Sequence, residues 1–325
     1  MPSDIAVEDQ PRSVTITHTR ADIVFRRIAF GAGTSTFVIM ALIGTFLLVR
    51  AAPAFHLAGL RFFTEQLWRP DETHPVFGIA AVLYGTVMLA AIALVLAVPV
   101  SVATALFVSE YAPLKVRRPL TALVDLLAAV PSLIFGLWGL FFLQPKMLGL
   151  AKFLSAHVGF IPIFHVQPGA VLVSSPFIAG VVLALMIVPI ITSVTREVFS
   201  QTPPGEKEGA LALGATRWGM IRTVMLPFGR GGIIGGSMLG LGRALGETIA
   251  VALILSPAFA ISPHILQPTG NSVASLIALR FGEAKHNGLS ALMAAGLSLF
   301  ILTLIVNIAA SAVVARSRSG KGVEI

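Results

Sequence analysis

Six long apolar blocks constrain this chain more than any other feature of its sequence. They cover approximately residues 28–49, 77–108, 119–143, 176–199, 231–256 and 290–315. A helix needs about 20 residues to cross a hydrocarbon core of roughly 30 Å, and each block is long enough. Transmembrane β-strands would instead be short segments of alternating polarity. The sequence therefore predicts an all-α, polytopic membrane protein with six transmembrane helices, in agreement with a composition that is 56% hydrophobic and 12% charged.

The distribution of Lys and Arg predicts how these helices are oriented. If the N-terminus is cytoplasmic, the cytoplasmic segments hold 15 basic residues, the outer segments hold 7, and Arg243 lies within a span. Basic residues accumulate in cytoplasmic loops, so both termini are expected in the cytoplasm. The same bias accounts for the formal charge of +8 without nucleic-acid binding. The chain is expected to divide into a cytoplasmic N-terminal segment with an amphipathic elbow (1–27), a six-helix transmembrane domain (28–315) and a cytoplasmic tail (316–325).

The cytoplasmic loop 200–230, between the fourth and fifth blocks, is expected to contain a short helix. Thr202 can cap this helix, Pro203 suits its first position, and Gly214 can close it. A second helix is expected to follow and to run to Pro227. Alanines in the first helix leave it a slim surface that another protein can approach closely.

Seven residues of this loop resemble the EAA motif of ABC importer permeases. They are Glu208, Gly209, Ala210, Gly214, Val224, Leu226 and Pro227. The sequence departs from the motif at Gly209, where the family has Ala, and at Val224, where it has Ile. The resemblance implies that this loop is an ATPase-coupling helix that docks in a groove of a partner ATPase. The alternative is an ordinary amphipathic loop helix.

The chain has no GxxxxGK[ST] loop for holding nucleotide phosphates. ATP and magnesium are therefore expected on the partner ATPase, and no cofactor is expected on this chain. The seven histidines lack metal-ligand spacing, so no metal site is predicted either. Because no catalytic motif is present, the chain is expected to be a non-catalytic subunit.

The fifth block carries small and charged residues on one face. At about 100° per residue, a continuous helix places Gly232, Gly236, Gly240, Arg243 and Glu247 in one stripe. Glycines at four-residue spacing let another transmembrane helix approach closely, so the three glycines are predicted to be helix-packing residues. The two charges are then expected to face protein or a water-filled cavity instead of lipid.

Arg243 and Glu247 are the candidate substrate-translocation residues. An ionisable group within a span costs about 2.5–3.5 kcal/mol on insertion scales, and such groups mark substrate paths by default. A guanidinium stays protonated and matches the oxygen atoms of phosphate or carboxylate, so Arg243 is predicted to attract an anion. Glu247 is expected to hold the guanidinium in place or to prevent overly tight binding. The alternative is a pair that only locks helices together.

The stretch GLGRALGETIAV (240–251) resembles the fifth-span signature of one of the two permease subunits of bacterial phosphate-specific ABC importers. The segments AAVPSLIFGLWGLFFL (128–143), EGALALGATRW (208–218) and LSALMAAGLSLFILTLIVNIAA (289–310) agree with the same family. The resemblance implies a multi-pass protein of the bacterial inner membrane that moves inorganic phosphate into the cytoplasm through a cavity shared with a second permease. It implies three partners: a PstA-like permease, a PstB-like ATPase dimer and an extracytoplasmic, PstS-like phosphate-binding protein.

Other functions fit part of this pattern. A permease for another oxyanion would share the cationic site. A secondary anion transporter would explain Arg243 but would leave the coupling loop unexplained, and no internal repeat is visible in the sequence. A membrane scaffold or sensor would need no charge within a span.

Three further features have two interpretations each. Asp125 is either an interfacial carboxylate satisfied by nearby basic residues or a gate in the path. Pro131 is expected to kink the third span, and Ser132 either accommodates the kink or lines the path. The outer segment 144–175 is too short to span again and is expected to lie on the surface or to be re-entrant.

Overall fold

The computed structural model describes residues 19–167, 169 and 172–317. The chain divides into two compact units, Met1–Phe46 and Leu47–Ile325, and helix α1 (Arg20–Ala58) runs from the first into the second. Residues 1–18 of the predicted N-terminal segment and residues 318–325 of the predicted tail lie outside the described part of the chain.

In the first unit, α1 presents apolar side chains to its surroundings. Phe25, Phe30 and Phe37 are all exposed. The only proline inside α1 is Pro53, which lies beyond this unit, so no proline interrupts the helical hydrogen bonds between Arg20 and Phe46. Residues 20–27 of the segment expected to contain the amphipathic elbow therefore belong to the same helix as the first predicted span.

The second unit is mostly helical in its described residues. After α1 its elements are η1 (Gly59–Phe63), α2 (Ala80–Leu106), η2 (Phe107–Tyr111), α3 (Leu114–Ala129), α4 (Ser132–Trp138), η3 (Gly139–Leu143), α5 (Gln144–Val158), η4 (Pro162–Phe164), α6 (Pro176–Ser200), α7 (Pro204–Ala212), α8 (Arg217–Met220), η5 (Ile221–Met225), α9 (Leu226–Leu245), α10 (Ile249–Ile254), α11 (Val273–Arg280) and α12 (His286–Ser317). A small antiparallel hairpin pairs β1 (Trp68–Arg69) with β2 (Val76–Phe77).

Within the described residues, six helical segments are long and apolar enough to cross a membrane. They are Arg20–Phe63, Ala80–Tyr111, Ser132–Val158, Pro176–Ser200, Arg217–Leu245 and His286–Val313. The predicted all-α class and the number of spanning helices are confirmed.

The bounds predicted for the third span are wrong. The range 119–143 falls on α3, α4 and η3, and the helical structure is interrupted between α3 and α4. Val130 at the break has an extended backbone, with ψ at 128°. A residue that precedes proline is pushed out of the helical region by the proline ring, so Pro131 ends the helix instead of kinking it.

Helix α6 forms the centre of the second unit and packs against α2, α3 and α9. Ile178, Ile187 and Ile191 of α6 are fully buried. A Cβ atom placed on Gly180 would lie 2.4 Å from Cγ2 of Ile92, so glycine is required for the close approach of α2. Helices in a membrane associate through such close van der Waals packing, because lipid is as apolar as their side chains.

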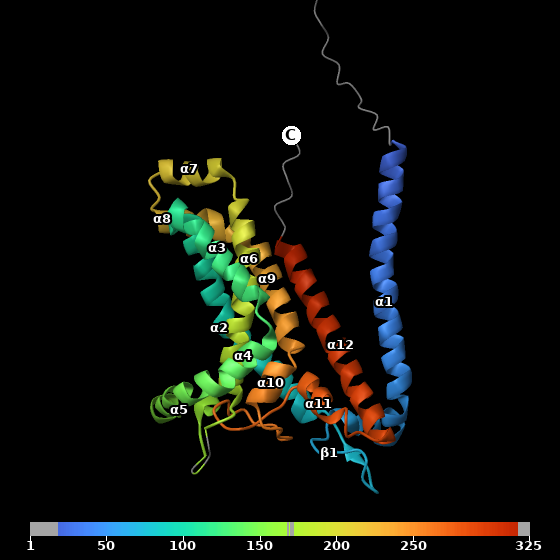
Figure 1. Cartoon of the computed structure of the whole chain (residues 1–325). Helices are drawn as coiled ribbons and strands as arrows, with labels where there is room; N and C mark the ends of the chain where they lie inside the picture. The colour runs from blue at the N-terminus through green and yellow to red at the C-terminus, as the bar shows by residue number, and fades with distance from the viewer. Residues whose placement is uncertain (1–18, 168, 170–171, 318–325) are drawn as a thin grey trace, which may run out of the picture. The chain divides into compact units, whose positions relative to one another are not determined.

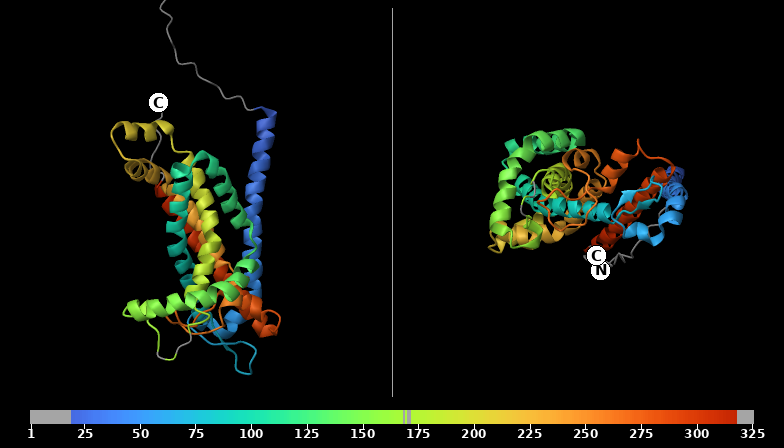
Figure 2. Two further views of the ribbon diagram at one scale, coloured as in Figure 1. Left: turned by 60° about the vertical axis from the view of Figure 1, so that its left-hand side comes forward. Right: turned by 90° about the horizontal axis from the view of Figure 1, so that it is seen from below.

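The two ends of the second unit differ in structure. Helices α7 and α8 lie at one end, where α12 also finishes, and α10, α11 and the β-hairpin lie at the opposite end (Figure 1). Helix α5 lies across this second end in both side views (Figures 1 and 2). The segment expected to be surface-lying or re-entrant, 144–175, begins with this helix.

Candidate functional site

Helix α9 lies against α6 through a row of glycines. A Cβ atom on Gly232 would lie 2.3 Å from Cγ2 of Val198, and one on Gly240 would lie 2.9 Å from Cδ1 of Ile191. A Cβ atom on Gly236 would lie 3.3 Å from the carbonyl oxygen of Ile191. The structure therefore places all three predicted helix-packing glycines against the same neighbouring helix.

Arg243 lies in the last turn of α9 and is half-buried. Its Nε atom is buried and has no hydrogen-bond partner within the described residues. A buried polar donor without a partner is costly, and the cost is larger for a charged group. The guanidinium thus retains an unused donor that a bound oxyanion could satisfy.

Glu247 does not continue the helix of Arg243, and the prediction of one unbroken fifth span over 231–256 is wrong. Helix α9 ends at Leu245, Gly246 follows it, and α10 starts at Ile249 as a separate helix. Glycine is unfavourable inside a helix. Glu247 is 8% exposed, and its carboxylate accepts a hydrogen bond from the backbone N–H of Ala250 at 3.2 Å. It thereby occupies the positive end of α10, where a negative charge is stabilised.

The candidate translocation residues lie near the same end of α9, but they are not in contact as a pair. In the described part of the chain, Arg243 and Glu247 form no ion pair. The expectation that Glu247 holds the guanidinium is not met, because its carboxylate is engaged by α10 instead. The i, i+4 geometry behind that expectation required a continuous helix.

A buried polar cluster surrounds the backbone of Glu247. The Ser272 hydroxyl donates to the Glu247 carbonyl oxygen at 3.5 Å, and Thr86 of α2 accepts from the N–H of Val273 at 3.0 Å. Asn271 accepts from the N–H of Ser272, while its own Nδ2 atom is buried and finds no partner in the described part of the chain. The cluster connects α2, the α9–α10 break and the start of α11. Sequence analysis missed it, although Asn-Ser-x-x-Ser at a helix start is a capping signature.

The residues of the EAA-like motif on α7 are largely accessible. Glu208 and Gly209 are exposed, and a Cβ atom on Gly209 would meet no atom within 4 Å. Ala210 is half-buried and packs against an apolar cluster formed by the ends of α2 and α6 with α8 and η5. Gly214 has a φ angle of 85°, a conformation that glycine adopts readily after a helix.

The start of α7 differs from the expectation. Pro203 is the N-cap residue and Pro204 is the first helical residue, so the predicted cap by Thr202 is wrong. The hydroxyl of Thr202 is buried and has no hydrogen-bond partner among the residues that the structure describes. The tandem prolines shift the start by one residue, because a proline fits the first helical position, where no N–H bond is required.

The second helix of the loop does not end at Pro227, as predicted, but continues through it into α9. One run, Arg217–Leu245, joins α8, η5 and α9. The π-helical turn η5 comes directly before this point, and such a widened turn accommodates a proline that lacks the usual N–H donor. Of the motif residues here, Val224 and Leu226 are half-buried and Pro227 is exposed.

The two groups of predicted site residues lie at opposite ends of α9. Helix α7 lies at one end, and α10, next to Glu247, lies at the other (Figure 1). The 20 residues of α9 correspond to about 30 Å at 1.5 Å per residue. Any effect of the loop on the charged residues must therefore be transmitted along helices.

Asp125 and Ser132 are placed on separate helices. Asp125 is exposed on α3, and its carboxylate accepts a hydrogen bond from the Ser193 hydroxyl of α6 at 3.5 Å. Ser132 is the first residue of α4. Across the residues that the structure describes, no cluster of His, Asp and Glu is arranged to hold a metal ion.

The chain matches a known family and several curated relatives. The model of the binding-protein-dependent transport system inner membrane component family matches residues 97–319. The phosphate transport system permease protein PstC 2 of Mycobacterium tuberculosis is 44% identical over 319 residues, which cover 96% of this chain and 95% of the relative. PstC of Xylella fastidiosa is 40% identical over 316 residues, which cover 96% of each protein.

Solved structures resemble this chain in fold. A bacterial alginate ABC transporter, in complex with an alginate-bound periplasmic protein, matches 92% of this chain and 98% of its own chain at 17% identity, with a TM-score of 0.61. The MetNI methionine ABC transporter in an inward-facing conformation matches 74% of this chain and 95% of its own chain at 16% identity, with a TM-score of 0.50. The family model and the curated relatives place the chain among the multi-pass cell membrane proteins of the binding-protein-dependent transport system inner membrane component family, in the group of PstC permeases.

Proposed function

We propose that this chain is one of two permease subunits of an ATP-driven importer that moves inorganic phosphate into the cytoplasm. The observation that carries the proposal is the similarity, over 96% of the chain, to relatives named phosphate transport system permease proteins. The alginate and methionine transporters are too distant to inform the substrate and support the fold alone.

Arg243 is the residue that attracts the anion in this proposal. The glycine contacts with α6 fix the position of α9, and Arg243 extends from its last turn with a buried, unpaired Nε atom. A phosphate ion offers the acceptor oxygen atoms that a guanidinium matches best. Glu247 stabilises the start of α10 next to this position and contributes a negative charge that limits how tightly the anion is held.

Coupling to ATP hydrolysis involves α7. The exposed residues Glu208 and Gly209 and the accessible surface around them suit a dock on a partner ATPase. ATP and magnesium bind to a dimer of that partner, and an extracytoplasmic binding protein delivers phosphate to a cavity shared with a second permease. Hydrolysis biases the transport cycle only if the partner contacts this chain differently in its two states, and α7 provides that contact.

The test is phosphate uptake by the complete complex in reconstituted vesicles. Arg243→Gln should lower the uptake of radiolabelled phosphate by at least about tenfold, the size of a charge-assisted contact of roughly 1.5 kcal/mol or more. Assembly and basal ATP hydrolysis should remain intact. Arg243→Lys keeps the charge but lacks the planar fork, so its uptake should be intermediate.

Three outcomes would contradict parts of the proposal. Uptake by Arg243→Gln at the normal rate would remove Arg243 from the path. A large assembly defect would instead support a helix-locking role. Uptake by the wild-type complex that follows an ion gradient and ignores ATP would indicate a secondary transporter.

A further inference from the structure

An ion pair joins α7 to the end of α2, and we propose that it transmits the displacement of α7 to the transmembrane helices. The Nζ atom of Lys207 lies 2.7 Å from Oε1 of Glu110, although the two residues are 97 positions apart in the sequence. Their side chains are only 21% and 17% exposed. The inference rests on the proposed function, because it assigns a coupling role to a contact of α7.

Helix α7 has few other attachments to the rest of the unit. None of its residues is fully buried, and the residue that it packs against the apolar cluster of α2, α6, α8 and η5 is the small Ala210. A contact through this small side chain buries little apolar surface, so it holds α7 only weakly. The partly desolvated ion pair is directional and stronger than an exposed one, so it fixes α7 to Glu110.

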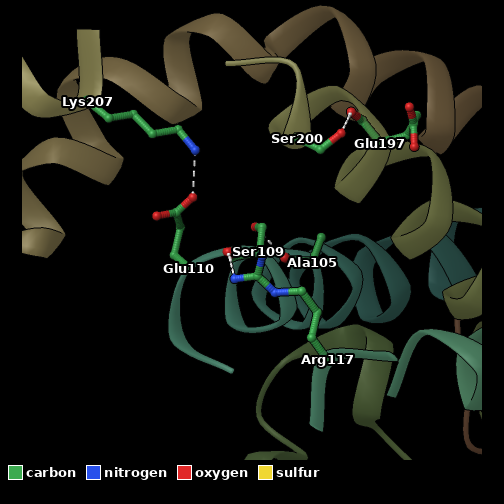
Figure 3. A network of polar contacts seen from close by, with 7 residues as sticks. All are labelled: Ala105, Ser109, Glu110, Arg117, Glu197, Ser200 and Lys207. Carbon is green, nitrogen blue, oxygen red and sulfur yellow. Dashed lines mark hydrogen bonds and ion pairs between the residues drawn. The ribbon is translucent and has the colours of Figure 1, made fainter. Parts of the chain in front are cut away.

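Glu110 is well placed to pass a displacement onward. It belongs to η2, the π-helical turn that ends α2, and the carbonyl oxygen of the adjacent Ser109 accepts a hydrogen bond from Arg117 of α3 at 2.5 Å (Figure 3). A displacement of Glu110 is therefore transmitted to both α2 and α3. Helix α2 packs along α6, and α6 holds α9 through the glycine contacts described above.

The pair bridges a space that side chains do not fill. A cavity of about 190 Å³ separates α7 from η2, α3 and α6. Its lining includes Arg117 and Arg196 in addition to the ion pair. If Lys207 were only neutralised, Glu110 could turn toward these arginines and keep a partner. Reversing the charge is therefore the sharper test of the connection.

The experiment is a charge swap in the reconstituted complex with its ATPase and binding protein. Lys207→Glu and Glu110→Lys should each lower phosphate uptake about tenfold, within the range of a typical coupling between sites. The ATPase should still co-purify and hydrolyse ATP at its basal rate, but the binding protein should no longer stimulate hydrolysis. The double variant should recover most of both activities, because it restores the pair with reversed polarity.

Arg117 and Arg196 line the same cavity, and their positive charges could disturb the swapped pair. A second double variant therefore tests the connection without charges. The chain contains no cysteine, so Lys207→Cys combined with Glu110→Cys can be joined by a short bifunctional reagent. Joining the two positions should restore stimulated hydrolysis and uptake that the unjoined variant lacks. The matched control is Glu283→Lys, which lies between α11 and α12, breaks an exposed ion pair with Arg280 at the end of α11 and should change neither activity.

Wild-type uptake in both single variants would overturn the proposal. Loss of the ATPase on purification of Lys207→Glu would also overturn it, because the residue would then act in docking. If neither the charge swap nor the cross-link restored activity, the contact between Lys207 and Glu110 would not be what transmits the displacement of α7. An error in the proposed substrate is distinguishable, since wild-type vesicles would then take up no phosphate while the loss of stimulated hydrolysis in Lys207→Glu would persist.

Discussion

Glu247 combines a negative charge with an acceptor for the backbone of α10, and two substitutions separate these properties. Glu247→Gln keeps an oxygen that can accept from the N–H of Ala250, whereas Glu247→Ala removes it. Loss of a capping acceptor costs about 1 kcal/mol, so we expect Glu247→Ala to lower the stability of the purified protein by that amount. Glu247→Gln should cost less than Glu247→Ala in the same thermal unfolding measurement, because it keeps the acceptor and loses only the favourable charge at the start of α10.

Phosphate uptake then reports on the charge itself. Because the glutamine variant preserves the cap, reduced uptake with normal stability would assign the defect to the lost charge. Equal destabilisation by both substitutions would show that the acceptor role inferred from the 3.2 Å contact is wrong.

For single residues, the sequence identified the important side chains better than it identified the groups that they contact. Arg243 and Glu247 stand out because charges are rare in an apolar block, and that signal needs no structure. Their relation depended on a helix that ends at Leu245. The contacts of Ser272 with Glu247 and of Val273 with Thr86 join positions 25 and 187 residues apart, and no local spacing predicts such pairs.

Among the helical elements, the contact of α9 with α6 gives a clear packing prediction. A methyl group at Gly232 would collide with the stiff, β-branched side chain of Val198 at 2.3 Å. Gly232→Ala should therefore destabilise the protein by about 1–3 kcal/mol, as overpacking usually does. Gly235→Ala is the matched control on the same helix, because a Cβ atom there meets nothing within 4 Å, and it should be neutral or slightly stabilising.

Unfolding in detergent, followed by loss of helical signal, measures both variants. Adding Val198→Ala to Gly232→Ala should restore only part of the stability, since it removes the two methyl carbons of Val198 but leaves its Cβ atom 2.6 Å from the new methyl group. Equal stability of the two single glycine variants would mean that α9 does not approach α6 as closely as described.

Helix positions were predictable from hydropathy, but helix ends were not. Each apolar block corresponds to one or more helices, because an apolar segment in lipid must satisfy its backbone internally. Whether a proline kinks or breaks such a helix depends on which neighbours satisfy the freed backbone groups. Pro131 breaks one helix and Pro227 lies within another after a π-helical turn, a difference that the sequence alone did not indicate.

The orientation of the whole molecule is a prediction that the second unit makes easy to test. The loop after α7 and the β-hairpin lie at opposite ends of this unit (Figure 1). Leu213 follows α7 and is 91% exposed, and Thr73 is exposed between the two strands of the hairpin. The excess of Lys and Arg assigns the α7 end to the cytoplasm.

Single-cysteine variants convert this assignment into an observation, because the chain has no cysteine of its own. In intact spheroplasts, a membrane-impermeant maleimide should label Thr73→Cys and leave Leu213→Cys unlabelled. Lysed cells should give labelling of both, which controls for accessibility. The opposite pattern in intact cells would place α7 outside, where no ATP-hydrolysing partner could reach it, and would refute both the predicted topology and the coupling role of Lys207 and Glu110.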